Sequence, residues 1–283
     1  MAQDPEVPVP PPPATLVGRM RWAVADALTV VRANLAHIAH VPEQLMDVTI
    51  QPLMFVLLFA YVFGSAITVP GGGSYRSFLM PGIFTQSLAF TAITTAVAVA
   101  NNMAKGVIDR FRSLPMARSA VLLGGTAADL IKNVLAVAVM AGCGLLIGWR
   151  TDHGLDQTAA GIALLLLFGF AMSWLGTFIG LIVRQPETAQ VFGFVFMFPL
   201  TFVANTFVPT AGMPRVLRSV ANWNPLSATV AACRQLFGDP GVAPPSGAWP
   251  LHHAVLASAG YSLLLLAVFL PLAVYRYRTA TAR

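Results

Sequence analysis

Long apolar runs alternate with short polar or charged stretches along this chain. Six runs reach the roughly 20 residues that an α-helix needs to cross about 30 Å of hydrocarbon. They cover residues 48–69, 78–100, 119–148, 159–183, 189–208 and 254–275. A membrane barrel would instead show shorter segments that alternate at period two. The pattern predicts an all-α integral membrane protein with six transmembrane helices.

The residues before the first run divide into two parts. Residues 1–18 are rich in proline, which favours an extended or disordered tail. Within 19–46, Trp22, Leu28, Leu35 and other apolar residues recur at spacings of three and four, so we expect an amphipathic helix lying on the membrane surface. The predicted organisation is therefore a tail (1–18), an interfacial helix (19–46) and a six-helix domain (47–283).

The segment between the fifth and sixth runs is irregular. It carries prolines at Pro209, Pro214 and Pro225, with Asn224 beside the last, yet it also holds apolar patches. Two short re-entrant helices that dip into the outer half of the membrane would fit this pattern, because irregular backbone at membrane depth must be buried in protein or face water. A structured external loop fits it equally well.

Composition and charge agree with a membrane protein. The chain is 57% hydrophobic and 10% charged, whereas a soluble domain carries about 25% charged residues. The net charge of +6 comes from short segments between apolar runs, so it indicates topology and not nucleic-acid binding. With both termini inside, inner segments hold eleven basic residues and outer ones five, which predicts cytoplasmic termini. Arginine far outnumbers lysine, which is typical of a GC-rich bacterial genome, so we expect a multi-pass protein of the bacterial cell membrane.

A basic stretch, residues 104–118, separates the second and third runs. Read as a helix, it places Val107, Phe111 and Leu114 on one face and turns Lys105 and Arg110 toward others. A charged stretch of this kind lies at a membrane surface. The residues alone leave two interpretations open, docking to a partner protein or attachment to anionic lipid.

The sequence lacks the motifs of several enzyme classes. It has no phosphate loop, no GxGxxG, no GxSxG and no HExxH, and Cys143 and Cys233 have no metal-ligand spacing. We therefore predict no catalytic residues, no metal site and no cofactor bound by this chain. Active transport would draw its energy from an ion gradient or from a second protein.

The third run alone carries ionisable residues well inside it. Asp129 and Lys132 are three residues apart and can pair on a helix. Either they form a structural pair, or they take part in the passage of substrate or protons. The second interpretation would make the chain a self-contained ion-coupled carrier. A membrane enzyme acting on lipid would need polar residues converging at one membrane depth, and the sequence shows no such cluster.

Two further patterns concern packing. Gly176 and Gly180 are four residues apart, a spacing that allows close approach of helices. The fifth run is rich in phenylalanine, which is typical of lipid-facing or core helices and would also suit a flat apolar substrate.

Two stretches give the chain a resemblance to a known family. They are GVIDRFRSLPMAR (106–118) and FVPTAGMPRVLRSVANWNPLSATVAACRQLF (207–237). Together with the six-run pattern, they resemble the permease subunits of type-2 ABC exporters, especially the daunorubicin/doxorubicin-resistance branch. The resemblance covers nearly everything after the proline-rich tail.

The resemblance implies a half-transporter and a set of partners. Two copies of the chain would form a homodimer in the membrane lipid, and two copies of a separate ATPase would bind ATP and Mg and drive export of a small amphipathic compound. The helix at 19–46 would be the connecting helix. The coupling helix that enters the ATPase would comprise Gly106, Val107, Asp109, Arg110, Phe111, Arg112, Leu114 and Pro115.

Overall fold

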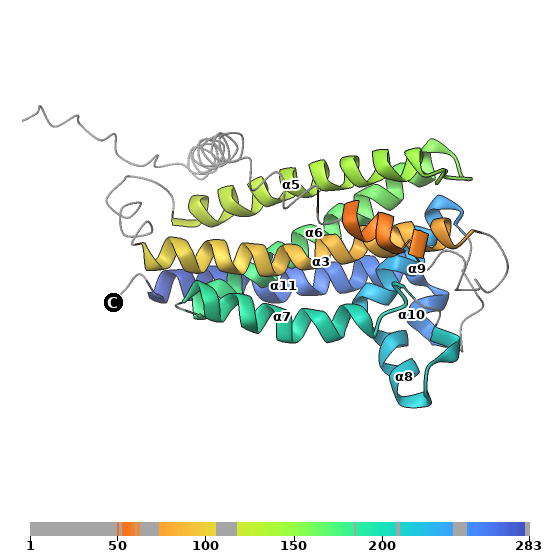
Figure 1. Cartoon of the computed structure of the whole chain (residues 1–283). Helices are drawn as coiled ribbons and strands as arrows, with labels where there is room; N and C mark the ends of the chain where they lie inside the picture. The colour runs from red at the N-terminus through yellow and green to blue at the C-terminus, as the bar shows by residue number, and fades with distance from the viewer. Residues whose placement is uncertain are drawn as a thin grey trace, which may run out of the picture.

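The fold is built from long helices that lie along one another (Figure 1). A computed structural model describes residues 50, 53–59, 61–62, 74–105, 118–183, 185–207, 210–239 and 248–280. Its long helices are α3 (Tyr75–Ala104), α5 (Arg118–Leu146), α6 (Leu155–Ile182), α7 (Pro186–Phe202) and α11 (Ala254–Ala280). No strand occurs within the described ranges.

Four of these helices are long and apolar enough to cross a membrane. They are Tyr75–Ala104, Leu122–Leu146, Leu155–Ile182 and Ala254–Tyr277, and they coincide with the second, third, fourth and sixth predicted runs. Of the first run, residues 50, 53–59 and 61–62 are described, and all of them are helical. The all-helical membrane class is thus confirmed for the part of the chain that the structure describes.

The fifth predicted run is too long at its carboxyl end. We expected a helix to residue 208, but α7 has 17 residues and ends at Phe202. The following backbone is bound by side chains of α9 (Pro225–Phe237): Ser227 Oγ accepts from Asn205 N at 3.1 Å, and the Arg234 guanidinium donates to the carbonyl oxygens of Asn205 and Thr206 at 3.0 and 3.3 Å. Because these groups are satisfied by α9, the helix does not need to continue.

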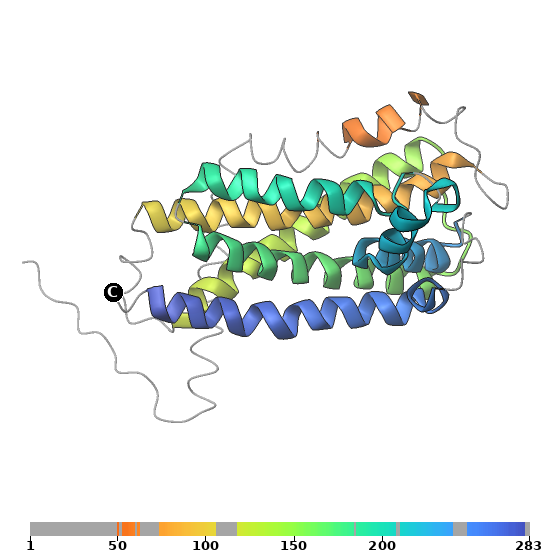
Figure 2. The same ribbon diagram turned by 90° about the horizontal axis from the view of Figure 1, so that it is seen from below.

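Short helices gather at one end of the bundle. The 3₁₀ turn η1 (Thr210–Gly212), α8 (Arg215–Trp223), α9 and α10 (Trp249–His252) lie near the start of α3 and the end of α7 (Figures 1 and 2). The opposite end holds the end of α3, the start of α5 and the end of α11. The long helices from α3 to α11 therefore alternate in direction between the two ends (Figure 1).

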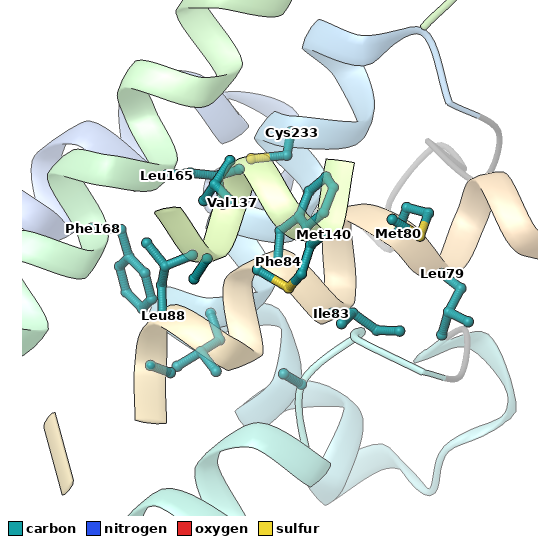
Figure 3. Packing of buried hydrophobic residues seen from close by; sticks show 14 of the residues in the cluster. Leu79, Met80, Ile83, Phe84, Leu88, Val137, Met140, Leu165, Phe168 and Cys233 are labelled. Atoms are coloured by element: carbon teal, nitrogen blue, oxygen red, sulfur yellow. The ribbon is translucent and has the colours of Figure 1, made fainter. Parts of the chain in front are cut away.

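The core is centred on α3. This helix packs most extensively against α6 and also contacts α5, α7 and α9. Figure 3 shows Leu79, Phe84 and Leu88 of α3 among side chains from α5, α6 and α9. Trp149, Phe84 and Phe237 meet edge to face, with centroid distances of 5.5 to 6.4 Å, and such pairs add about 0.5–1.5 kcal/mol each beyond burial.

Candidate functional site

The predicted coupling stretch lies outside the described residues, as do the tail and the interfacial helix. The structure describes its two flanks: α3 ends at Ala104 and α5 begins at Arg118. Both flanks lie at the end of the bundle opposite α8, α9 and α10 (Figure 1). The role of residues 106–115 stays a prediction.

A polar cluster joins α3 to α5. Lys132 Nζ lies 3.2 Å from Asp129 Oδ1, and the Thr95 hydroxyl of α3 donates to Asp129 Oδ2 at 2.7 Å. One turn along, the Thr91 hydroxyl donates to Asn133 Oδ1 at 2.8 Å. Asp129 and Asn133 are buried, whereas the Lys132 side chain is 32% exposed.

This cluster lies in the first half of its span: Asp129 is seven residues after Leu122, where the span begins, which is roughly 10 Å along the helix. Lys132 is ten residues into that span, and its ammonium group is paired with Asp129 there. The arrangement provides a neutral ion pair with one half-exposed donor, suited to holding α5 on α3 or to contacting a polar group in the membrane.

The predicted re-entrant segment forms two short helices with a sharp elbow between them. Asn224 ends α8 and also begins α9, where its Oδ1 accepts from Leu226 N at 2.9 Å. Pro225 occupies the first turn of α9 and Pro214 precedes α8, both positions that tolerate a missing N–H. Asn224 Nδ2 donates to Leu200 O of α7 at 2.7 Å, which fixes the elbow to the bundle. Pro209 lies outside the described residues.

Arg234 is a buried side chain that connects three elements, and the sequence did not predict this role. The charge count placed it in an outer loop, but it is only 1% exposed. Its Nε donates to Phe78 O of α3 at 3.0 Å, and its guanidinium carbon lies 3.6 Å from the centre of the Phe78 ring. With its bonds to Asn205 O and Thr206 O, this one side chain links α9 to α3 and to the end of α7.

Asp239 supplies a negative charge next to Arg234. Its carboxylate oxygens accept from Trp149 Nε1 at 3.0 and 3.2 Å, which fastens the α5–α6 connection to the end of α9. Burial raises the pKa of Asp239 from 3.8 to about 7; the Trp149 hydrogen bond and the nearby Arg234 lower this pKa, and Asp152 raises it. The carboxyl group therefore changes charge near neutral pH.

The Phe-rich helix α7 contacts the bundle through a narrow seam. It buries Ala189, Gly193, Met197 and Thr201. After Gln190, its exposed large side chains are apolar: Val191, Phe192, Phe194, Val195, Phe196, Phe198 and Phe202. An apolar face of this size is covered by lipid, by another protein chain or by an apolar ligand.

Some of these residues carried a signal in the sequence. Thr91 and Thr95 are four residues apart on the predicted second run, so they share a helix face, and a lone arginine in the apolar patch around Arg234 is expensive to bury unless bonded. The structure brings Asp129 and Lys132 together on α5, whereas Asn224 lies between α8 and α9. Among the described residues, no group of three or more His, Cys, Asp or Glu side chains could hold a metal ion.

Comparison with known proteins agrees with this architecture. The family model described as "ABC-2 type transporter" matches residues 26–237. The chain is 33% identical over 261 residues to the daunorubicin resistance ABC transporter permease protein DrrB1 of Streptomyces coeruleorubidus, covering 90% of this chain and 89% of that relative. The chain belongs to the ABC-2 type transporter family.

Two less similar relatives are also named as permeases. This ABC-2 permease is 23% identical over 228 residues to the probable doxorubicin resistance ABC transporter permease protein DrrC of Mycobacterium tuberculosis, with 80% of this chain and 76% of that protein covered. It is 24% identical over 203 residues to the putative transport permease ycf38 of Pyropia yezoensis, with 69% and 68% covered. The family match confirms the resemblance derived from residues 106–118 and 207–237.

Proposed function

We propose that this ABC-2 permease is the membrane subunit of an ATP-driven exporter that moves a hydrophobic or amphipathic compound out of the bacterial cell. The observation that carries the proposal is the 33% identity, over 90% of the chain, with a permease named for daunorubicin resistance. ATP and Mg belong to a separate subunit, because the sequence has no phosphate loop, and the family resemblance implies two copies of that subunit. The chain itself has no ATPase site.

Coupling to that subunit is assigned to residues 106–115. Phe111 and Leu114 are the apolar anchors, since buried aromatic and aliphatic side chains dominate contacts of this kind, and Arg110 and Arg112 meet acidic or carbonyl groups of the ATPase. The flanking helices α3 and α5 would carry the push into the bundle as a rigid-body movement. Both termini are cytoplasmic, which puts this stretch on the ATPase side.

The second permease copy and the substrate would meet the exposed face of α7. A helix that buries small residues and exposes seven large apolar ones needs a cover, and a homodimer supplies it. The ring faces of Phe192 and Phe196, 4.5 Å apart, would also suit a flat amphipathic compound.

The test is an uncoupling variant of the complete complex. Phe111→Ala should leave the chain in the membrane with its ATPase bound, and should abolish stimulation of ATP hydrolysis by substrate. Phe111→Leu is the matched control, because it keeps an apolar anchor and should retain most of the stimulation. Normal substrate-stimulated hydrolysis with Phe111→Ala would refute the coupling assignment.

A second candidate function follows from the ion pair on α5. A buried carboxylate bonded to Lys132 and Thr95 inside a span could carry protons in a self-contained, gradient-driven carrier. That carrier would transport without an ATPase, and Asp129→Asn would abolish the transport.

A further inference from the structure

Helix α8 is amphipathic, and its apolar face points away from the protein. Val216, Val220 and Trp223 follow one another at spacings of four and three, and they are 75%, 55% and 58% exposed. The opposite face points toward the protein: Asn222 is 5% exposed and Ala221 is fully buried. A helix on a water-exposed surface would do the reverse, so this face requires an apolar cover.

The depth of α8 in the bundle indicates what that cover is. The Tyr261 hydroxyl of α11 donates to Trp223 O at 3.2 Å, and Tyr261 is seven residues into the span that begins at Ala254, which is roughly 10 Å along the helix. A span of 24 residues is about 36 Å long and exceeds the hydrocarbon by only about 3 Å at each end. Because side chains tilt toward the helix amino terminus, the Tyr261 hydroxyl and the carboxyl end of α8 lie beside the first two turns of this span, where hydrocarbon meets headgroups. The bond from Asn224 to Leu200 holds the elbow beside the last turn of α7.

The surroundings of this face match a lipid interface. Trp223 on α8 and Trp249 on α10 are both exposed, and tryptophan collects where hydrocarbon meets headgroups. Arg215 is exposed at the start of α8, where a guanidinium can bind a phosphate. On α11, Leu263 and Leu264 next to Tyr261 are also exposed, so apolar surface continues from α8 onto a helix that crosses the membrane.

We propose that α8 is a phospholipid-binding surface. Val216, Val220 and Trp223 pack against the upper acyl chains of the adjacent leaflet, and Arg215 binds the phosphate of an anionic headgroup. The bound lipid holds the Asn224 elbow, between α8 and α9, at the level of that leaflet. This proposal is independent of what the permease transports and of the ATPase that drives it.

The decisive experiment measures the surroundings of residue 220 in the full chain. Cys143→Ser and Cys233→Ala remove the native thiols, and Val220→Cys then carries a spin label in nanodiscs of phosphatidylcholine and phosphatidylglycerol. Two matched sites give the reference values: Leu264→Cys on the lipid face of α11, and Asp156→Cys at the exposed start of α6.

We expect the label at 220 to be reached by oxygen as readily as that at 264, and to be shielded from a water-soluble nickel reagent that reaches 156. Access by nickel equal to that at 156 would overturn the proposal. So would strong spin–spin coupling, or a disulfide formed between two chains through residue 220, because a second copy would then cover the face.

A second measurement tests the role of Arg215. Energy transfer from tryptophan to pyrene-labelled lipid should favour phosphatidylglycerol over phosphatidylcholine, and Arg215→Gln should reduce this preference about fivefold. Arg150→Gln is the control, since Arg150 is exposed at the same end of the bundle but donates to the carbonyl oxygens of Leu145 and Trp149. An unchanged preference in Arg215→Gln would remove the headgroup contact from the proposal.

Discussion

At the scale of single residues, buried charges are held by specific partners. Arg234 reaches three backbone carbonyls, Asp239 accepts from an indole, and Asp129 is bonded to a lysine and a threonine. Burying a charge without such bonds costs several kcal/mol. Each of these residues therefore makes a measurable contribution that depends on its partners.

The first prediction concerns pH and Asp239. Its pKa of about 7 in the folded protein is above the value of 3.8 expected in the unfolded chain, so the folded state holds the proton more tightly. Its contribution to the free energy of unfolding is complete below pH 4 and is lost as the pH rises through 7, at no more than about 1.4 kcal/mol per pH unit. The melting temperature in detergent should fall between pH 5 and pH 8.

The control for this prediction is Asp239→Asn. Its amide oxygen still accepts from Trp149 but does not titrate, so the melting temperature should vary less between pH 5 and pH 8. A pH profile identical to that of the unmodified chain would show that another group controls the dependence.

The second prediction concerns the ion pair on α5. Lys132→Met leaves the buried Asp129 carboxyl without its counter-ion, so that it must stay uncompensated or take up a proton, and should cost about 1–3 kcal/mol of stability because Lys132 is partly exposed. The double variant Asp129→Asn with Lys132→Met removes both charges and should recover most of that loss. Thermal unfolding of the two single variants and the double variant measures the coupling; purely additive losses would contradict a functional pair.

At the scale of elements, α3 and α6 are held together by a close approach of backbones. A methyl group on Gly180 would lie 2.5 Å from Ala96 O, and one on Gly176 would overlap the carbonyl of Ala92. Both glycines therefore face α3 across a contact with no room for a side chain. The GxxxG spacing, weak evidence in the sequence, here marks a real helix contact.

The third prediction uses this contact. Gly176→Ala should cost about 1–3 kcal/mol, because backbone atoms of α3 have to shift to admit the methyl group. Gly142→Ala on α5 is the matched control, since a methyl group there meets nothing within 4 Å and should leave stability unchanged or slightly raised. Equal melting temperatures for the two variants would show that α3 and α6 do not meet this closely.

Sequence reasoning succeeded where a signal is local. Apolar runs identified α3, α5, α6, α7 and α11, and the spacing of Asp129 and Lys132 was sufficient to suggest their pairing. It failed where the answer lies in distant residues. The end of α7 depends on Arg234 and Ser227, more than 20 residues later, and the burial of Arg234 depends on the carbonyl of Phe78, 156 residues away. No local pattern contains those contacts.

At the scale of the whole molecule, the two ends of the bundle differ. One end carries the elbow, Arg234 and Asp239, which tie α3, α7, α9 and the α5–α6 connection together. The other end holds the helix ends that flank residues 106–117 (Figure 1). A displacement of the α3–α5 connection would move both helices as rigid bodies. Because the helices pack along their length, the movement would reach the end that carries Arg234 and Asp239. This arrangement suits a transporter that is driven from one side and releases its substrate at the other.

The most direct test of this account is transport by inside-out vesicles. The vesicles contain this chain with a candidate ABC ATPase subunit, with either subunit alone, or with neither, and the probe is daunorubicin, chosen from the name of the 33% identical relative. We predict uptake that requires ATP and both subunits and that a proton gradient does not replace. Uptake by this chain alone, driven by a gradient and indifferent to ATP, would contradict the account.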